Sequence, residues 1–227
     1  MLFWHDVGHR VWYWGWREHK EQAGGGWSLD GGVHFADLFR FYLGDVTRLV
    51  GLSKAYFPTR FRDEKTKSDP VHVTVEDTTM ALLEFANGVS GEWTSTNVAR
   101  GQGFGRRVIY GSEGSLDLRD GLQVGEEKRS IKELTETYMA SLSPEEKERL
   151  FPRGITEPVA TELWEFIQAV QGKERVETDA LEGYKAEAIS IAVYESAAIG
   201  QWVTLEEIEN LQVEAYQSEI NADLGLT

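Results

Sequence analysis

The chain has 227 residues, with 38 acidic and 23 basic side chains, so its formal net charge is −15. This charge repels the phosphates of nucleic acids and of anionic membranes, and we expect neither as a partner. The absence of cysteine excludes disulfides, thiolate catalysis and Cys-ligated metal centres. No apolar run approaches the roughly 18 residues of a membrane span, and the first residues do not resemble a signal peptide. These features predict a cytoplasmic protein.

The first third of the chain predicts a strand, a loop, a helix and a second strand. Residues 1–18 are rich in aromatics and lack helical periodicity, so they predict a strand followed by an irregular loop. An apolar face at helical spacing predicts a helix from about Asp30 to Leu43, which Gly44 would end. Residues 46–57 predict a strand. Residues 58–74 are charged, contain two prolines and predict a loop.

The middle of the chain predicts antiparallel hairpins. Asn87 and Gly88 lie between two β-rich runs, and this pair favours a tight hairpin turn. Residues 106–118 predict two further short strands around a Gly-rich turn. Asp120 and Gly121 predict another turn before a short strand at 122–124.

Helices are predicted in the last third. Ser143 and Pro144 are typical of the start of a short helix. A second helix would end at Gly172, and a third would begin at Asp179 and end at Gly200. The second has an apolar face formed by Val159, Leu163, Phe166 and Val170, and the third would turn Ala188, Ile191, Ala192 and Ala198 inward.

Hairpins followed by helices indicate an α+β fold, and a mostly antiparallel open sheet with helices on one face is the simplest arrangement. Residues 202–205 predict a short strand, and the acidic tail, 206–227, is either helical or frayed. We find no repeat and no linker, so residues 1–227 are expected to form a single domain.

The stretch AGGGWSLDGGVHFAD, residues 23–37, carries the clearest candidate site. Asp30 and His34 are four residues apart, which on a helix places them on the same face. A carboxylate beside an imidazole suits proton transfer near neutral pH, and Gly25 and Gly26 would let a ligand approach bare backbone. The alternative is structural: Asp30 caps the helix, and the glycines allow tight packing.

This stretch, followed by an aromatic helix and LGDV, resembles the Gfo/Idh/MocA oxidoreductases, which include glucose–fructose oxidoreductase and inositol dehydrogenase. The downstream runs VEDTTMALLEFANGVSGEW, VIYGSEGSLDL, TELWEFIQAVQGK and EAISIAVYESAAIGQWVTL resemble the family in the same order. The resemblance covers about residues 16–205. It implies hydride transfer between NAD or NADP and a hydroxyl or ketone carbon of a sugar or cyclitol.

The resemblance also implies roles for particular residues. His34 would be the general acid or base on the reacting hydroxyl, and Asp30 would orient His34 or help to bind substrate. Some members of the family carry Tyr in place of this His, so the role varies. The resemblance further implies a homo-oligomer that pairs through the exposed sheet face.

The family's Rossmann domain has no counterpart in this sequence. There is no Glu-Lys-Pro motif, and GQGFG at 101–105 does not lie between a strand and a helix, as a dinucleotide-binding loop would. The chain therefore resembles the substrate and oligomerisation half of a two-domain dehydrogenase, completed by a Rossmann domain in cis or in trans. We expect the chain alone to be inactive and to bind no nicotinamide cofactor. In the complete enzyme, the cofactor would approach only the backbone of this chain, at Gly25 and Gly26.

Two further clusters have alternative interpretations. Trp14 and Trp16, with Trp12, alternate as in a strand, and they either stack on a sugar ring or pack against protein. Arg17 either reaches a substrate oxygen or forms a surface ion pair.

His5, Asp6 and His9 are residue types that can bind zinc or manganese. His5 and His9 would share one face only in a helix, and their neighbours look extended, so we predict no metal.

A different class of function also stays open for the whole chain. It could be a non-catalytic sugar-binding or oligomerisation module that lacks the cofactor domain.

Overall fold

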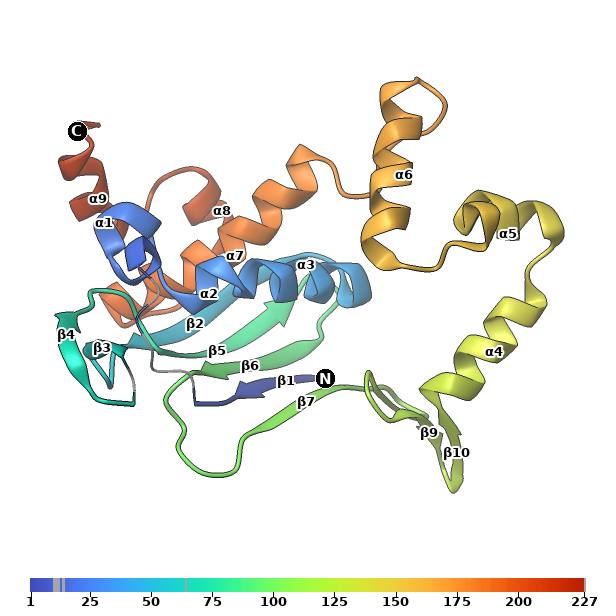
Figure 1. Cartoon of the computed structure of the whole chain (residues 1–227), viewed down its shortest axis with the longest axis horizontal. Coiled ribbons are helices and arrows are strands. Elements are labelled where there is room, and N and C mark those ends of the chain that lie inside the picture. Colours follow the sequence, from blue (N-terminus) through green and yellow to red (C-terminus); the bar gives the residue numbers. More distant parts are fainter. Residues whose placement is uncertain (10–12, 14, 64, 227) are drawn as a thin grey trace.

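A nine-stranded sheet forms the centre of the structure, a computed structural model that describes residues 1–9, 13, 15–63 and 65–226. Its strands are β1 (Leu2–Val7), β2 (Val46–Lys54), β5 (Thr78–Phe85), β6 (Ser90–Thr96), β7 (Phe104–Tyr110), β8 (Gly114–Asp117), β9 (Gly121–Val124), β10 (Glu127–Ser130) and β11 (Val203–Thr204). Their order is β10-β9-β8-β7-β1-β6-β5-β2-β11 (Figure 1). Only β1 and β6 pair in parallel; every other neighbouring pair in this sheet is antiparallel.

Two helices, α3 (Gly32–Leu43) and α7 (Ala180–Ile199), cover one face of this sheet (Figure 1). The α+β class, the mostly antiparallel sheet and the helices on one face are therefore confirmed. The parallel pair was not expected, because β1 is inserted between β6 and β7 from a distant part of the chain. The other helical segments are η1 (Gly15–Glu18), α1 (Lys20–Ala23), α2 (Trp27–Asp30), α4 (Ile131–Ser141), α5 (Pro144–Leu150), η2 (Pro152–Gly154), α6 (Pro158–Val170), α8 (Leu205–Glu209) and α9 (Gln217–Asp223).

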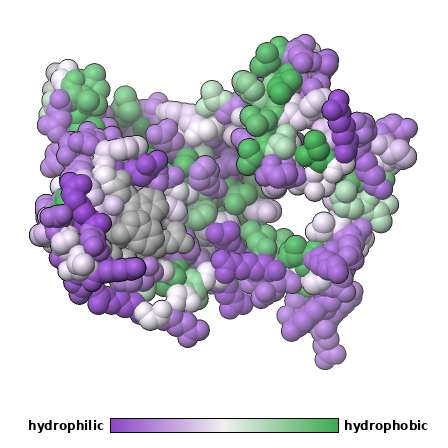
Figure 2. Space-filling model, in the orientation of Figure 1, coloured by the Kyte–Doolittle hydropathy of each residue, from purple (hydrophilic) through white to green (hydrophobic). Residues whose placement is uncertain are grey.

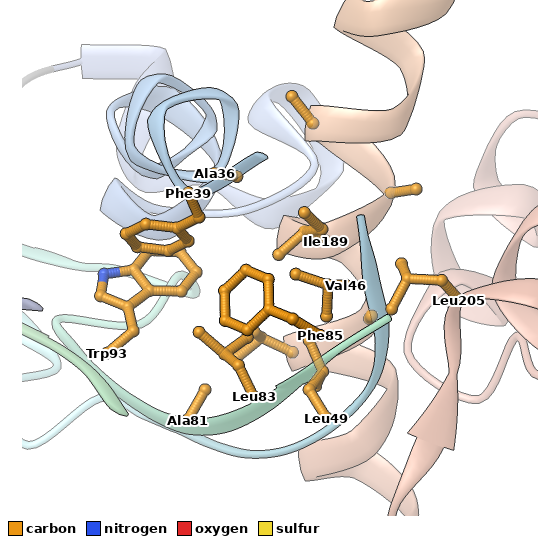
Figure 3. Packing of buried hydrophobic residues seen from close by; sticks show 14 of the residues in the cluster. Ala36, Phe39, Val46, Leu49, Ala81, Leu83, Phe85, Trp93, Ile189 and Leu205 are labelled. Carbon is orange, nitrogen blue, oxygen red and sulfur yellow. The ribbon is translucent and has the colours of Figure 1, made fainter. Parts of the chain in front are cut away.

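The core lies between the sheet and these two helices (Figure 3). The indole of Trp93 on β6 is fully buried and meets Phe39 of α3 edge to face, with ring centroids 5.6 Å apart. Gly32 begins α3 directly over this indole, and a Cβ there would lie 2.7 Å from Trp93 Cζ2. Glycine at this position therefore lets the helix that carries His34 lie against the sheet.

Several local predictions are confirmed. Gly44, at φ 83°, follows the end of α3, and the β5–β6 hairpin turns through Asn87 and Gly88. Ser143 caps α5 in a capping box, and Asp179 caps α7 by accepting two backbone N–H bonds. These features depend on hydrogen bonds within a few residues, which explains why the sequence pattern predicts them.

Other predictions were wrong. The predicted loop at 58–74 contains a two-stranded hairpin, β3 (Thr59–Asp63) and β4 (Ser68–His72). Trp16 lies in the 3-10 turn η1 rather than in a strand. The long helix begins at Gly32 and not at Asp30, which ends α2. Ala198 is exposed because α7 extends beyond the edge of the core there.

Helix α6 forms as predicted, but its apolar face is exposed. Val159 and Phe166 are each 58% exposed, and Val170 is 73% exposed. Figure 2 shows hydrophobic surface at the upper right of the molecule, where Figure 1 places α6 away from the sheet. An amphipathic helix normally buries such a face, so the surface is unusual for a folded chain.

Candidate functional site

The glycine-rich stretch forms the turn between α1 and α2. Gly24 has a φ of 76°, which suits glycine and ends α1. A Cβ on Gly25 would lie 2.6 Å from the Tyr194 hydroxyl oxygen, and one on Gly26 would lie 2.6 Å from the backbone oxygen of Glu76. Both glycines are therefore required by protein packing, which agrees with the structural interpretation of this stretch. Approach of a cofactor to their backbone stays a proposal.

The buried carboxylate of Glu76 holds this turn in place. It accepts hydrogen bonds from the backbone N–H of Gly26 at 2.8 Å and of Ser28 at 2.9 Å. The hydroxyl of Tyr194 on α7 donates a third bond at 3.0 Å. Burial raises the pKa of Glu76, and the two backbone bonds and the tyrosine bond oppose that rise. The carboxylate thus joins the turn before α2, the segment that leads into β5, and helix α7.

The C-terminal tail reaches the same turn through a tyrosine pair. Tyr216 stacks on Tyr194 with ring centroids 4.6 Å apart, and its hydroxyl donates to the backbone oxygen of Gly24 at 2.9 Å. Burial and the neighbouring charge of Glu76 raise the pKa of both tyrosines. Both hydroxyls therefore stay protonated and serve as hydrogen-bond donors at neutral pH. The tail is consequently part of the scaffold of the site.

The raised pKa of Glu76 gives a prediction for stability. The folded state favours the protonated carboxyl, so it binds more protons than the unfolded state above pH 4.5, the ordinary glutamate value. The contribution of this carboxyl to the free energy of unfolding therefore decreases as pH rises from 4.5 through the folded-state pKa. Glu76→Gln removes the titration, so wild type should lose stability relative to this variant over that pH range. Urea unfolding at a series of pH values measures the difference; a difference that grows in favour of wild type with pH contradicts the assignment.

Asp30 and His34 are separated by the break between two helices. Asp30 ends α2, Gly31 links the helices, and His34 lies in the first turn of α3. Asp30 does not cap α3, because Gly31 occupies the N-cap position. Both side chains are exposed, and within the described residues no hydrogen bond joins them. His34 therefore offers a free imidazole at the surface.

Arg17 and Asp30 form an ion pair. Arg17 Nε donates to Asp30 Oδ1 at 3.4 Å, and both side chains are partly exposed. The surface ion pair foreseen for Arg17 is thus present, and its partner is one of the two predicted catalytic residues. The ion pair holds the Asp30 carboxylate at the end of α2, four residues before His34 in the sequence.

Arg17 and Asp30 both line a small cavity of about 40 Å³. The predicted residues Arg17, Gly26 and Asp30 all line it. His34, Gly25 and Trp16 are not among its lining residues. The remaining walls come from η1, α2, β3, the segment before β5 and the residue after β6, through Glu18, Trp27, Arg60, Val75, Glu76 and Asn97. Burial raises the pKa of Glu18, and the charge of Arg60 opposes the rise.

The other predicted residues are placed as follows. Trp16 is 52% exposed, with the Arg17 guanidinium 4.7 Å from its ring centroid. Trp14 and Trp12 lie outside the described residues. His5 hydrogen-bonds Glu92 at 3.0 Å on the outer face of the sheet. Among the residues that the structure describes, no three His, Asp or Glu side chains form a group that could hold a metal ion.

Two residues of the site were missed by the sequence interpretation. Arg60 was assigned to a loop, yet β3 carries it into the cavity, where it is 3% exposed. Glu76 was noted only as part of a hairpin. The buried Val73 and Val75 that precede it alternate with polar residues. This pattern could have indicated that the segment before β5 is extended and partly buried. No comparable signal marks Arg60, since arginine is seldom buried.

Within the described part of the chain, every helix is too short or too polar to cross a lipid bilayer.

Comparisons with known proteins give the fold a family. The levoglucosan dehydrogenase of Pseudarthrobacter phenanthrenivorans is 27% identical, and the match covers 85% of this chain and 55% of that protein. The 1,5-anhydro-D-fructose reductase of Ensifer adhaerens is also 27% identical, with 85% and 51% covered. A solved structure of levoglucosan dehydrogenase with NADH and L-sorbose superposes with a TM-score of 0.66 at 21% identity, covering 92% of this chain and 59% of that one.

The chain spans about half the length of the curated relatives that it matches. The model of the oxidoreductase family C-terminal alpha/beta domain, the Gfo/Idh/MocA type, matches residues 4–205. That range includes the glycine turn, Asp30, His34 and the walls of the cavity. The chain therefore belongs to the Gfo/Idh/MocA oxidoreductase family, of which it represents the C-terminal alpha/beta domain.

Proposed function

We propose that this chain is the substrate-binding half of an NAD(P)-dependent oxidoreductase that oxidises or reduces a carbon of a neutral sugar. The observation that carries the proposal is the polar cavity lined by the Arg17–Asp30 ion pair, with the exposed imidazole of His34 four residues further along the chain, in the first turn of α3. In this proposal His34 exchanges the proton of the reacting hydroxyl. Asp30 holds substrate or orients His34, and Arg17, Trp16 and Trp14 contact substrate.

The relatives support the choice of substrate class. Two of them are named for anhydro sugars, levoglucosan and 1,5-anhydro-D-fructose. These two sugars are therefore the first substrates to test. A solved relative contains NADH, which supports a nicotinamide cofactor. The cofactor would supply or accept the hydride, and Gly25 and Gly26 would allow its close approach in the complete enzyme. We place the parent enzyme in the cytoplasm, since the cysteine-free sequence suits a reducing compartment.

The test is turnover of sugars by the complete enzyme, formed by this chain with its nucleotide-binding domain in cis or in trans. Levoglucosan, 1,5-anhydro-D-fructose and a set of aldoses and cyclitols are offered with the matching cofactor, and NAD(P)H absorbance is followed. Turnover of at least one neutral sugar is expected. A folded, cofactor-binding assembly that turns over none of them contradicts the proposal and favours a non-catalytic sugar-binding or oligomerisation module.

The isolated chain should not bind NADH with useful affinity. In a Rossmann domain the pyrophosphate is received by a helix N-terminus after a Gly-rich loop. The GQGFG run of this chain instead leads into β7. Calorimetric titration of the isolated chain with NADH and NADPH should therefore give no measurable heat of binding. Binding in the micromolar range would contradict the proposal that the cofactor binds to a separate nucleotide-binding domain.

The exposed sheet face should make the protein a homo-oligomer. On the face opposite α3 and α7, Leu82 is 52% exposed, and Met80 on the same strand pairs with Leu52 of β2. An open apolar sheet face is normally covered by another layer. Light scattering should give twice the monomer mass or more, and Leu82→Glu should yield a monomer. Leu224→Glu after α9, where the leucine is 62% exposed, is the matched control and should leave the assembly intact. A wild-type monomer at about 10 µM would contradict the assignment.

A further inference from the structure

The C-terminal tail packs on the glycine turn through Tyr216. Its hydroxyl donates to the backbone oxygen of Gly24 at 2.9 Å, and its ring stacks on that of Tyr194, with centroids 4.6 Å apart. The ammonium nitrogen of Lys20, on α1, lies 3.9 Å from the centroid of the Tyr216 ring and 2.8 Å from Oε2 of Glu219. Helix α9 accordingly lies beside α1 (Figure 1). One side chain of the tail therefore contacts both α1 and the turn that follows it.

A buried carboxylate on α7 holds the backbone of the tail at the same place. Glu195 is 1% exposed, and it accepts hydrogen bonds from the backbone N–H of Tyr216 at 2.8 Å and of Gln217 at 2.9 Å. A buried carboxylate is costly unless hydrogen-bond donors surround it, and these two N–H groups serve as such donors. Ile220 of α9 is buried as well. Residues 216 and 217 are therefore anchored to the body of the domain.

The glycine turn connects this contact to Asp30. Helix α2 is a single turn that begins after Gly26, and the N–H of Asp30 donates to the backbone oxygen of Gly26 at 2.9 Å. The backbone before Gly26 is tightly packed, since a Cβ on Gly25 would lie 2.6 Å from the Tyr194 hydroxyl oxygen. A shift of Gly24 is therefore expected to carry Gly26 and Asp30 with it.

We propose that Tyr216 is a positioning residue, which acts through the glycine turn to hold the Asp30 carboxylate where the substrate binds. Tyr216 itself touches neither substrate nor cofactor. This inference rests on the proposed function and adds to it a contribution from the tail, which lies beyond residues 4–205, the range that the family model matches.

The first test is Tyr216→Phe in the complete enzyme. It removes the hydroxyl but leaves a ring that can stack on Tyr194, so the tail should stay docked while the turn loses a hydrogen bond. We expect kcat/KM for the best sugar to fall by about tenfold, because a small misplacement of a substrate-binding group is enough for such a loss. Tyr184→Phe is the matched control, since it removes a hydroxyl that donates to the backbone oxygen of Glu209 at 3.3 Å and so joins α7 to α8 rather than to the turn. That variant should keep the wild-type kcat/KM.

A double-mutant cycle with Asp30→Asn separates positioning from general stability. If Tyr216 acts through Asp30, Tyr216→Phe should change kcat/KM by less than about twofold once the carboxylate is gone. A merely structural role would give the same loss in both backgrounds, and that result overturns the inference. Wild-type kcat/KM in the Tyr216→Phe single variant overturns it as well.

Hydrogen exchange of the chain gives a readout that does not need turnover. In Tyr216→Phe the amide of Asp30 should exchange faster, while the amides of the β5–β6 hairpin should keep their wild-type rates. Unchanged exchange at Asp30 contradicts the inference even if turnover falls. A wild-type assembly that binds cofactor yet turns over no sugar contradicts the proposed function instead, and the positioning role falls with it.

Discussion

Replacing His34 with alanine is expected to lower the turnover of the complete enzyme by about a hundred- to ten-thousand-fold. Removal of a positioned general acid or base typically costs this much, because the proton of the reacting hydroxyl must then pass to or from water. Cofactor affinity should stay close to that of wild type, since in the proposed enzyme a separate nucleotide-binding domain would bind the phosphates of the cofactor. Steady-state kinetics with the best sugar of the panel, together with NADH titration, separate the two effects.

A histidine elsewhere in the chain provides the control for this prediction. His72 is exposed on β4, and His72→Ala should leave turnover unchanged. Asp30→Asn should lower turnover less than His34→Ala, because it removes the partner of Arg17 but leaves the imidazole in place. If His34→Ala turns over sugar at the wild-type rate, His34 has no role in proton transfer.

Replacing Glu76 with alanine is expected to destabilise the chain by about 3 kcal/mol or more. The substitution leaves three buried donors without their acceptor: the N–H groups of Gly26 and Ser28, and the hydroxyl of Tyr194. Each such loss typically costs about 1–3 kcal/mol, and relief from burying a carboxylate offsets part of the sum. Urea unfolding of the isolated chain measures the change in the free energy of unfolding.

The glycine turn should also lose its order in this variant. Hydrogen exchange of the Gly26 and Ser28 amides should quicken more than that of the amides in the β5–β6 hairpin. Glu84→Ala is the matched control, because Glu84 lies on β5 and its carboxylate accepts hydrogen bonds from the exposed Arg48. It should shift the urea midpoint far less. A Glu76→Ala variant as stable as the Glu84→Ala control would mean that the buried carboxylate does not hold the turn.

Local signals in the sequence predicted the parts of the fold that depend on neighbouring residues. The Asn87–Gly88 turn, the Ser143 cap and the Asp179 cap each involve hydrogen bonds within a few positions. The hairpin of β3 and β4 was missed because charged residues and Pro70 disfavour a strand there. Lys67 and Asp69 also adopt positive φ angles of 51° and 52°, which side-chain-bearing residues seldom take.

The candidate site was only partly predictable for the same reason. Asp30, Arg17 and Gly26 lie within 14 positions of one another in the sequence, and the motif marked them together. Arg60 and Glu76 come from segments whose contact with that motif exists only after the sheet has formed. The need for glycine at Gly25 likewise depends on Tyr194, which lies far along the chain. A pattern confined to one stretch carries no information about such contacts.

Transfer of an isotope label follows the hydride that the proposed reaction moves. The complete enzyme is given the oxidised cofactor and its best sugar, carrying deuterium on the carbon that bears the reacting hydroxyl, and the recovered cofactor is analysed by NMR. We expect deuterium to move to C4 of the nicotinamide ring, and the His34→Ala variant to transfer it far more slowly. Deuterium that stays on the sugar or appears in water, in an assembly that binds both cofactor and sugar, would contradict the proposed reaction.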